Sequence, residues 1–541
     1  MAIEQKVLDE MILPYPDKVK KNRSKHILRK NPDQGCQQIE ANTRTVPGIM
    51  SQRGCAYAGC KGVVIGPIKD MITITHGPVG CGYYTWGSRR NKARADDITP
   101  PEKVYSTLCF TTDMQEPDIV FGGEKKLAKM IDEVVEMFHP RGINICATCP
   151  IGLIGDDLNA VAKTAAEKHG IPVLAYNCEG YKGVSQSAGH HIANNILMDR
   201  VIGTGEKAPD PDQFVVNILG EFNIGGDSWE ILRVLKEIGY TIQGVMTGDS
   251  SYEEIKNLHI ANLNLVLCHR SLNYIADMME TRYGIPWLKV FFIGIEPFKK
   301  TLREIAKVTG SDHFIAKTEE VIIREESRIM PVIEHYRKIC TGKTAFAFNG
   351  GSRSHHYQLL LRDLGMEVIA AGYEFAHRDD YEGRQVIPTI KADADSKNIP
   401  DLDVKADPEW YQEPHIHLRL SKEKYDELCD SIRFGHYAGI YPDMKSGTVL
   451  IDDINHHEME QLLKDVQPDI FFAGIKDKYF VQKMGIPAKQ LHSYDYSGPY
   501  AGFNGAVNFA RDVANALTTP AWSLIAPPWE NSNNTGGGTN A

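Results

Sequence analysis

No part of the sequence is apolar for the roughly 18 consecutive residues that a membrane helix requires. The start of the chain, MAIEQKVLDEMILPYPDKVKKNRSKH, has no apolar core followed by a small-residue cleavage site, so it is not a secretory signal. A G-x-x-x-x-G-K-S/T phosphate loop is also missing. We therefore expect a cytoplasmic protein that crosses no membrane and does not itself bind ATP.

The sequence also lacks a strong excess of charge of one sign, and its number of cysteines is not even. The net charge of −10 is a mild acidic excess, which argues against a nucleic-acid partner. The chain has 11 cysteines, an odd number, and disulfides are rare in large cytosolic proteins. Each thiol should therefore be either a buried apolar group or a metal ligand.

The length of the chain, 541 residues, exceeds the roughly 250 to 300 residues at which a single hydrophobic core stops growing. Short β-rich runs such as FVVNILG, LNLVLC and TAFAFNGG alternate with helical periods such as SWEILRVLKEIG and HYQLLLRDLG. This alternation is typical of βαβ units. The sequence thus predicts an α/β protein of three Rossmann-like domains with parallel sheets.

We expect an N-terminal arm (1–48), domain I (49–205), domain II (206–340), domain III (341–530) and a disordered tail (531–541). Within domain III, a polar, acidic, proline-bearing segment from about 382 to 447 shows no clear strand, and we interpret it as a surface insertion. Each apolar strand ends at a loop with Gly, Cys, His or Asp, where open α/β sheets bind ligands. Metal clusters would therefore lie at strand-end loops and between domains.

Three thiols lie among small or glycine-rich residues at strand edges: Cys55 in RGCAYAGCKG, Cys81 in HGPVGCGYYTWG and Cys149 in ATCPIGLIGDD. Glycine lets the backbone approach an anionic cluster closely and direct N–H groups toward its sulfurs. Taken singly, each thiol is more simply a buried small apolar residue. Taken together, the three loops favour metal ligation.

Long strings along the chain resemble one family. RGCAYAGCKGVV, ITHGPVGCGYYTWGSRR, CPIGLIGDD, CEGYKGVSQSAGHHIANN, CHRSLNYI, GYEFAHRDDYEGR and LHSYDYSGPYAGF are similar to molybdenum-type nitrogenase α chains, in the longer, insertion-bearing clostridial-type branch. The resemblance runs from about Asn42 to about Glu530. It implies a catalytic subunit that reduces dinitrogen to ammonia with release of hydrogen, while a separate iron protein hydrolyses ATP and supplies electrons.

The resemblance implies two metal clusters. Cys55, Cys81 and Cys149 match the α-chain ligands of the 8Fe-7S P-cluster, whereas Cys60 and Cys146 are not in ligand positions. Each terminal iron normally takes a cysteine, so a β subunit must supply the remaining ligands, in an α2β2 assembly. Electrons would pass from the iron protein to the P-cluster and on to an iron–molybdenum cofactor with homocitrate.

For that cofactor, Cys268 in LCHRSL matches the thiolate on the terminal iron, and His492 in LHSYDY matches the imidazole on molybdenum. Without the surrounding match, a lone histidine would more simply be structural. The other matching residues would supply positive charge, close backbone approach and polar contacts around an anionic cofactor. They are Arg270, Ser271, Gly350, Gly351, Arg353, Glu374, Lys476 and Gln490.

Further matches lie beside the reactive face of the cofactor. His190 in SAGHHIAN is the expected proton donor, because histidine titrates near neutral pH, and Gln186 is its neighbouring amide. Val63 would shield the same face sterically, and Arg89 belongs to the same pocket. His191 is interpreted as structural.

Three alternatives stay open. Vanadium or iron-only nitrogenases share these cysteines and the histidine ligand, although the arginine kept in GGSRSHH favours the molybdenum type. A cofactor-assembly scaffold, which is a binding protein, is expected to lack His492 and the side chain of His190. Dark protochlorophyllide reductase has the same fold but would not need the paired cofactor ligands. The insertion, expected near domain III, would affect docking of the iron protein.

Overall fold

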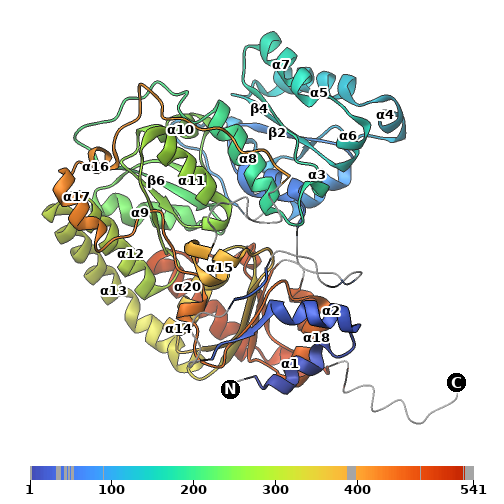
Figure 1. Ribbon diagram of the computed structural model, residues 1–541, viewed down its shortest axis with the longest axis vertical. Helices are drawn as coiled ribbons and strands as arrows, with labels where there is room; N and C mark the ends of the chain where they lie inside the picture. The colour runs from blue at the N-terminus through green and yellow to red at the C-terminus, as the bar shows by residue number, and fades with distance from the viewer. Residues whose placement is uncertain are drawn as a thin grey trace.

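The computed structural model describes residues 3–31, 38–41, 46, 49, 54–88, 91–386, 398–474, 477–527 and 529. Three separate sheets lie in three parts of the molecule (Figure 1). Apart from one strand contributed by the N-terminal arm, their strands fall within the ranges expected for domains I, II and III, and the prediction of an α/β protein with three parallel sheets is confirmed. The exact domain boundaries stay a prediction, and the expected disordered tail lies outside the described residues.

The first sheet is fully parallel and has the strand order β3-β2-β4-β5. Every residue of β4 is buried, as expected for a parallel strand covered by helices on both faces. Its strands are β2 (Ile72–His76), β3 (Phe110–Thr111), β4 (Ile143–Ala147) and β5 (Val173–Tyr176). Its helices are the π-helix η2 (Ala58–Ile65), α3 (Val79–Gly87), α4 (Glu116–Phe121), α5 (Glu124–Phe138), α6 (Cys149–Ile154), α7 (Leu158–His169) and α8 (Ser187–Arg200).

The second sheet is also parallel, with the order β7-β6-β8-β9. Helix α10 begins with a capping box between Ser251 and Glu254, and Gly239 ends α9 at φ +116°, a conformation that favours glycine. The strands are β6 (Val215–Glu221), β7 (Thr241–Thr247), β8 (Leu263–Val266) and β9 (Trp287–Lys289). The helices are α9 (Asp227–Ile238), α10 (Tyr252–Lys256), α11 (His269–Tyr283), α12 (Ile295–Val308) and α13 (Asp312–Cys340).

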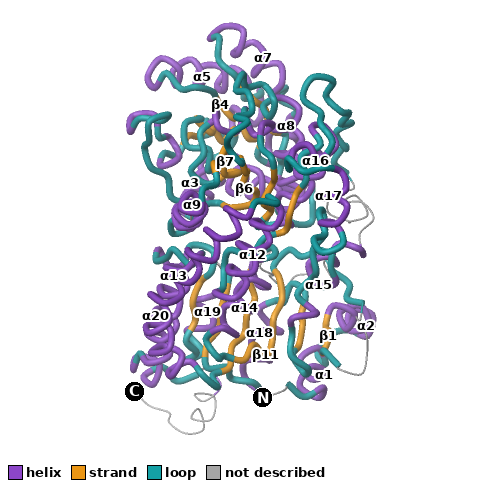
Figure 2. Tube along the Cα trace, turned by 90° about the vertical axis from the view of Figure 1, so that its left-hand side faces the viewer, coloured by secondary structure: helices purple, strands orange, loops and turns teal. Residues whose placement is uncertain are grey.

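The third sheet has the order β1-β12-β11-β10-β13-β14 and gains one antiparallel strand from the N-terminal arm. Its strands are β1 (Ile27–Arg29), β10 (Thr344–Asn349), β11 (Glu367–Tyr373), β12 (Val449–Ile451), β13 (Ile470–Ala473) and β14 (Ala488–Gln490). Its helices are α1 (Gln5–Ile12), α2 (Asp17–Arg23), α14 (Arg353–Asp363), α15 (Arg378–Glu382), α18 (His456–Asp465), α19 (Lys478–Gln482) and α20 (Gly502–Thr518). Figure 2 shows α1, α2 and β1 at the same end of the molecule as α18.

Two long helices, α13 and α20, connect the second and third parts of the molecule. Helix α13 packs against α12 of the second part and against α20 of the third.

None of the helices in the described ranges combines the length and the apolar character that a membrane crossing needs.

The insertion lies against the second sheet's part of the molecule, where α16 (Pro414–His417) and α17 (Lys422–Cys429) appear beside α12 and α13 (Figure 1). The Asn262 side chain donates to the backbone oxygen of His417, and the His417 ring lies 2.8 Å from the Tyr283 oxygen. Leu418 and Ile440 are fully buried. The described parts, 382–386 and 398–447, contain no strand, and apolar side chains of the second part enter the core, so this segment is a packed strap. Its end also contacts the third part of the molecule, where Asp443 lies 2.6 Å from the His355 ring.

Glu280 of α11, beneath this strap, provides a test of pH-dependent stability. Burial raises its pKa to about 7, and the charge of Asp277 adds to the rise. A carboxyl with a raised folded pKa binds its proton more tightly in the folded state, so stability falls as pH rises from about 4.5 to 7. Glu280→Gln should therefore stabilise the protein at pH 8, by at most about 3 kcal/mol, and have little effect at pH 4.5.

Thermal unfolding of the purified protein at the two pH values measures this difference. The matched control is Glu409→Gln, which replaces an exposed carboxylate of the same strap. An equal gain at both pH values, or the same gain from the control, would contradict the assigned titration.

Candidate metal centres

The three thiols in glycine-rich loops gather at one partly exposed place. Cys81 lies on α3 after β2, Cys149 begins α6 after β4, and Cys55 precedes η2. A methyl group built on Gly180 would lie 3.0 Å from the Cys149 sulfur and 3.4 Å from the Cys55 sulfur. Burial, followed by the charges of Cys55 and Cys149, raises the pKa of Cys81. The fold therefore brings these three predicted residues together.

Large side chains on the elements that carry these cysteines are exposed on the surface. Tyr84 of α3 is 75% exposed and Leu153 of α6 is 79% exposed, and Val79, Tyr83 and Tyr181 are also exposed. Cys55 itself is exposed, whereas Cys81 and Cys149 are half-buried. A thiol group open to solvent within an apolar surface has the character of half of an interface.

Cys268 occupies the position expected from the sequence, between β8 and α11, where it is the N-cap of the helix. Its side chain is 5% exposed. The Ser271 hydroxyl lies 3.3 Å from its sulfur, and the Ser352 hydroxyl donates to the sulfur at 3.5 Å. Two serine hydroxyls thus contact the sulfur that is predicted to bind the metal cluster.

His492 reaches the same turn, Gly350 to Arg353, that contacts Cys268 through Ser352. A methyl group on Gly350 would lie 3.1 Å from the His492 Nε2 and 3.1 Å from a Glu374 oxygen, and would strike Phe375. Gly351 adopts φ +44°. The turn requires glycine at both positions. Its backbone therefore comes close to His492, while its Ser352 contacts Cys268, and these are the two side chains predicted to hold the cofactor.

The two described arginines of this region are paired with buried carboxylates that sequence reasoning missed. Arg270 donates to both oxygens of Asp379, at 2.7 and 2.9 Å, and lies 3.1 Å from Asp380. Arg353 donates to the Tyr494 hydroxyl at 2.9 Å and lies 3.7 Å from Glu221 and 3.9 Å from Asp227.

Glu221 is one of those carboxylates and is fully buried. Burial and the neighbouring Asp227 raise its pKa to about 7, against the opposing charge of Arg353. A proton-binding group that titrates near neutral pH thus lies beside Arg353, although no local sequence signal points to it.

The residues expected beside the reactive face come from α8 and η2. His190 is fully buried, and its ring meets Phe375 edge-on at a centroid distance of 6.1 Å. Gln186 packs so closely on the segment before and within η2 that a methyl group on Gly54 or Gly59 would clash with it. Val63 lies on η2 and is 7% exposed. A π-helix at such a place is a frequent mark of a functional site.

Of the remaining residues named from the sequence, some are described by the structure and others are not. Gln490, at the end of β14, is buried and accepts a hydrogen bond from Ser493 at 2.9 Å. Arg89 and Lys476 lie outside the described residues. His191, interpreted as structural, packs edge-on against Tyr274.

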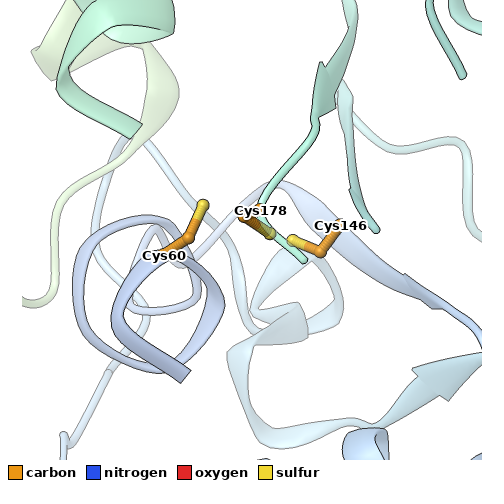
Figure 3. Close-up of side chains that lie close together, drawn as sticks. All are labelled: Cys60, Cys146 and Cys178. Carbon is orange, nitrogen blue, oxygen red and sulfur yellow. The ribbon is translucent and has the colours of Figure 1, made fainter. Parts of the chain in front are cut away.

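A further group of three cysteines is fully buried. Among the described residues, Cys60, Cys146 and Cys178 have sulfur atoms that all lie within 4.8 Å of one another and could hold a metal ion (Figure 3). The sequence analysis placed Cys60 and Cys146 outside the P-cluster ligand positions and assigned no role to Cys178. Only the packing of η2 against the first sheet brings Cys60 to Cys146.

The fold and the gathered thiols define an α/β protein built to hold metals at strand-end loops. A family model described as nitrogenase component 1 type oxidoreductase matches residues 55–518. The nitrogenase molybdenum-iron protein alpha chain of Clostridium pasteurianum is 53% identical over 529 residues, which are 98% of this chain and 97% of the relative. That of Methanosarcina barkeri is 52% identical over 531 residues, 98% of each chain.

A solved structure described as nitrogenase Cp1 at pH 6.5 has a TM-score of 0.92 and 53% sequence identity, covering 97% of this chain and 100% of that chain. The chain therefore belongs to the nitrogenase component 1 type oxidoreductase family. Within that family it is a nitrogenase α chain of the molybdenum–iron type, the catalytic subunit of an oxidoreductase. The resemblance inferred from its motifs is confirmed.

Proposed function

We propose that the chain binds an iron–molybdenum cofactor with homocitrate through Cys268 and His492 and reduces dinitrogen to ammonia with release of hydrogen, in the cytoplasm. The observation that carries this proposal is the Gly350–Arg353 turn. Ser352 contacts the Cys268 sulfur, and Gly350 leaves room beside His492 only because it lacks a side chain. A thiolate suits an iron–sulfur cluster, and an imidazole is a common transition-metal ligand.

The chain's own residues would position and protect the reaction. When bound, the cofactor supplies the metal centre at which dinitrogen is reduced. His190 holds a proton in a fully enclosed site, and Gln186 fixes the packing of α8 on η2. Val63 restricts approach sterically. Arg89 and Lys476 remain proposed members of the same pocket, together with Arg270, Ser271, Gly351, Arg353, Glu374 and Gln490.

The P-cluster would be held by Cys55, Cys81 and Cys149 together with thiolates of a β subunit. Three thiols that converge at a partly exposed apolar surface supply half of such a site. We infer an α2β2 assembly in which this surface meets the β subunit. A separate iron protein, which hydrolyses ATP, would deliver electrons to that complex.

Metal analysis of the purified α2β2 complex tests the proposal. We expect one molybdenum per α chain, and ammonia formation when the complex is combined with an iron protein, ATP and a reductant. Vanadium, or iron alone, at that stoichiometry would identify one of the other nitrogenase types. A complex that holds the cofactor but forms no ammonia or hydrogen would indicate an assembly scaffold.

A further inference from the structure

A compact group of thiols includes none of the residues proposed to hold the two clusters. Cys60 of η2, Cys146 of β4 and Cys178, two residues after β5, are each 0% exposed. Their sulfurs lie within 4.8 Å of one another, and Figure 3 shows the side chains gathered between the π-helix and the strand ends. All three are free thiols. We propose that they form an additional metal site, which takes a single thiophilic d10 cation, either Cu(I) or Zn(II).

The spacing of the sulfurs suits one bound ion. With metal–sulfur bonds of about 2.3 Å, three sulfurs around one metal lie roughly 4 Å apart. The observed limit of 4.8 Å therefore needs only a small inward movement of the three side chains. Thiolates select soft ions such as Cu(I) and Zn(II) over Mg²⁺, Ca²⁺ or Mn²⁺.

The charges around the group favour a cation. Burial opposes ionisation of Cys146, but hydrogen bonds from Cys178 and Cys60 and the positive charge of Lys61 outweigh it and lower its pKa to about 5. Burial raises the pKa of Cys60 and Cys178. The Cys178 thiol also donates to the Ala147 carbonyl oxygen at 3.6 Å. Because metals bind thiolates, an entering cation displaces the protons of the thiols that it binds, and these protons leave to solvent.

A neighbouring phenol supplies a second, independent indication. The Tyr176 hydroxyl is fully buried and has no hydrogen-bond partner among the described residues. Tyr176 of β5 pairs in register with Cys146 of β4, so these two side chains lie on the same face of the sheet. The Tyr176 O–H can donate to a metal-bound thiolate, or its oxygen can complete the four ligands that Zn(II) prefers.

Metal content tests this site in the intact α2β2 protein. The protein is produced in cells supplied with copper or with zinc, and the purified protein is also exposed without oxygen to Cu(I) or Zn(II) held by a competing chelator. We expect one copper or one zinc per α chain. X-ray absorption at the metal edge should show three sulfur neighbours, with one additional oxygen neighbour only for zinc.

Two variants and a matched control complete the experiment. Cys146→Ala and Cys178→Ala should each weaken metal binding by at least about 10- to 100-fold. Loss of a residue that only supports a ligand already costs roughly this much, and these variants lose a ligand. Cys340→Ala removes an equally buried thiol from α13, outside the group, and should retain the ion. The proposal is overturned if wild-type protein takes up neither ion by either route, if the metal has no sulfur neighbours, if a disulfide joins two of the cysteines, or if the control loses the ion equally.

Discussion

An α2β2 protein in which Cys268 is replaced by alanine is expected to hold less than about a tenth of the parent's molybdenum and to lose dinitrogen reduction in proportion. Cys268 is the one thiol proposed to hold the cofactor. It is the N-cap of α11, and the hydroxyls of Ser271 and Ser352 contact its sulfur. Alanine removes the ligand but fits the same space, so the surrounding core should remain folded.

Molybdenum and iron are measured together in the purified variant. Iron should fall only by the cofactor's share, because Cys55, Cys81 and Cys149 are unchanged. Ser271→Ala is the matched control: it keeps the ligand and removes one hydroxyl, so its loss of molybdenum should be clearly smaller. Full molybdenum content in the Cys268 variant would show that the cofactor is held elsewhere.

The parts of the fold that could be predicted are those with a local signal. The apolar runs Ile143–Ala147 and Val215–Glu221 predicted buried parallel strands, because such strands are covered on both faces. The three-residue strand Ile27–Arg29 could not be predicted. It is too short to show a period of two, and only its antiparallel pairing with Val449–Ile451, more than four hundred residues away, makes it a strand.

The same distinction applies to the site. Cys268 could be placed at a strand end because it closes an apolar run, and strand ends of α/β sheets bind ligands, whereas its role as a cofactor ligand came from the family resemblance. Asp379 and Asp380, which pair with Arg270, carry no such signal, because α15 reaches α11 only through packing. The group of Cys60, Cys146 and Cys178 was missed for the same reason: the three residues lie far apart along the chain, and only packing brings their sulfurs together.

Replacing Arg23 with methionine is expected to reduce the free energy of unfolding by about 3 to 5 kcal/mol. Arg23 ends α2 and donates two hydrogen bonds of 2.7 Å to Glu458 of α18. The two side chains are 2% and 0% exposed. Methionine fills a similar volume but leaves the Glu458 carboxylate buried without its cation, which is the costly part of breaking a buried ion pair. Denaturant unfolding of the purified complex measures the loss.

A surface ion pair of similar geometry gives the control. Arg303 donates two hydrogen bonds to Glu319, and their side chains are 49% and 40% exposed, so Arg303→Met should change stability by no more than about 1 kcal/mol. The double variant Arg23→Met with Glu458→Gln should recover most of the loss, since glutamine removes the buried charge and can keep the hydrogen bond from Tyr15. If the double variant is as unstable as the single one, lost packing of the N-terminal arm, rather than an unpaired carboxylate, accounts for the effect.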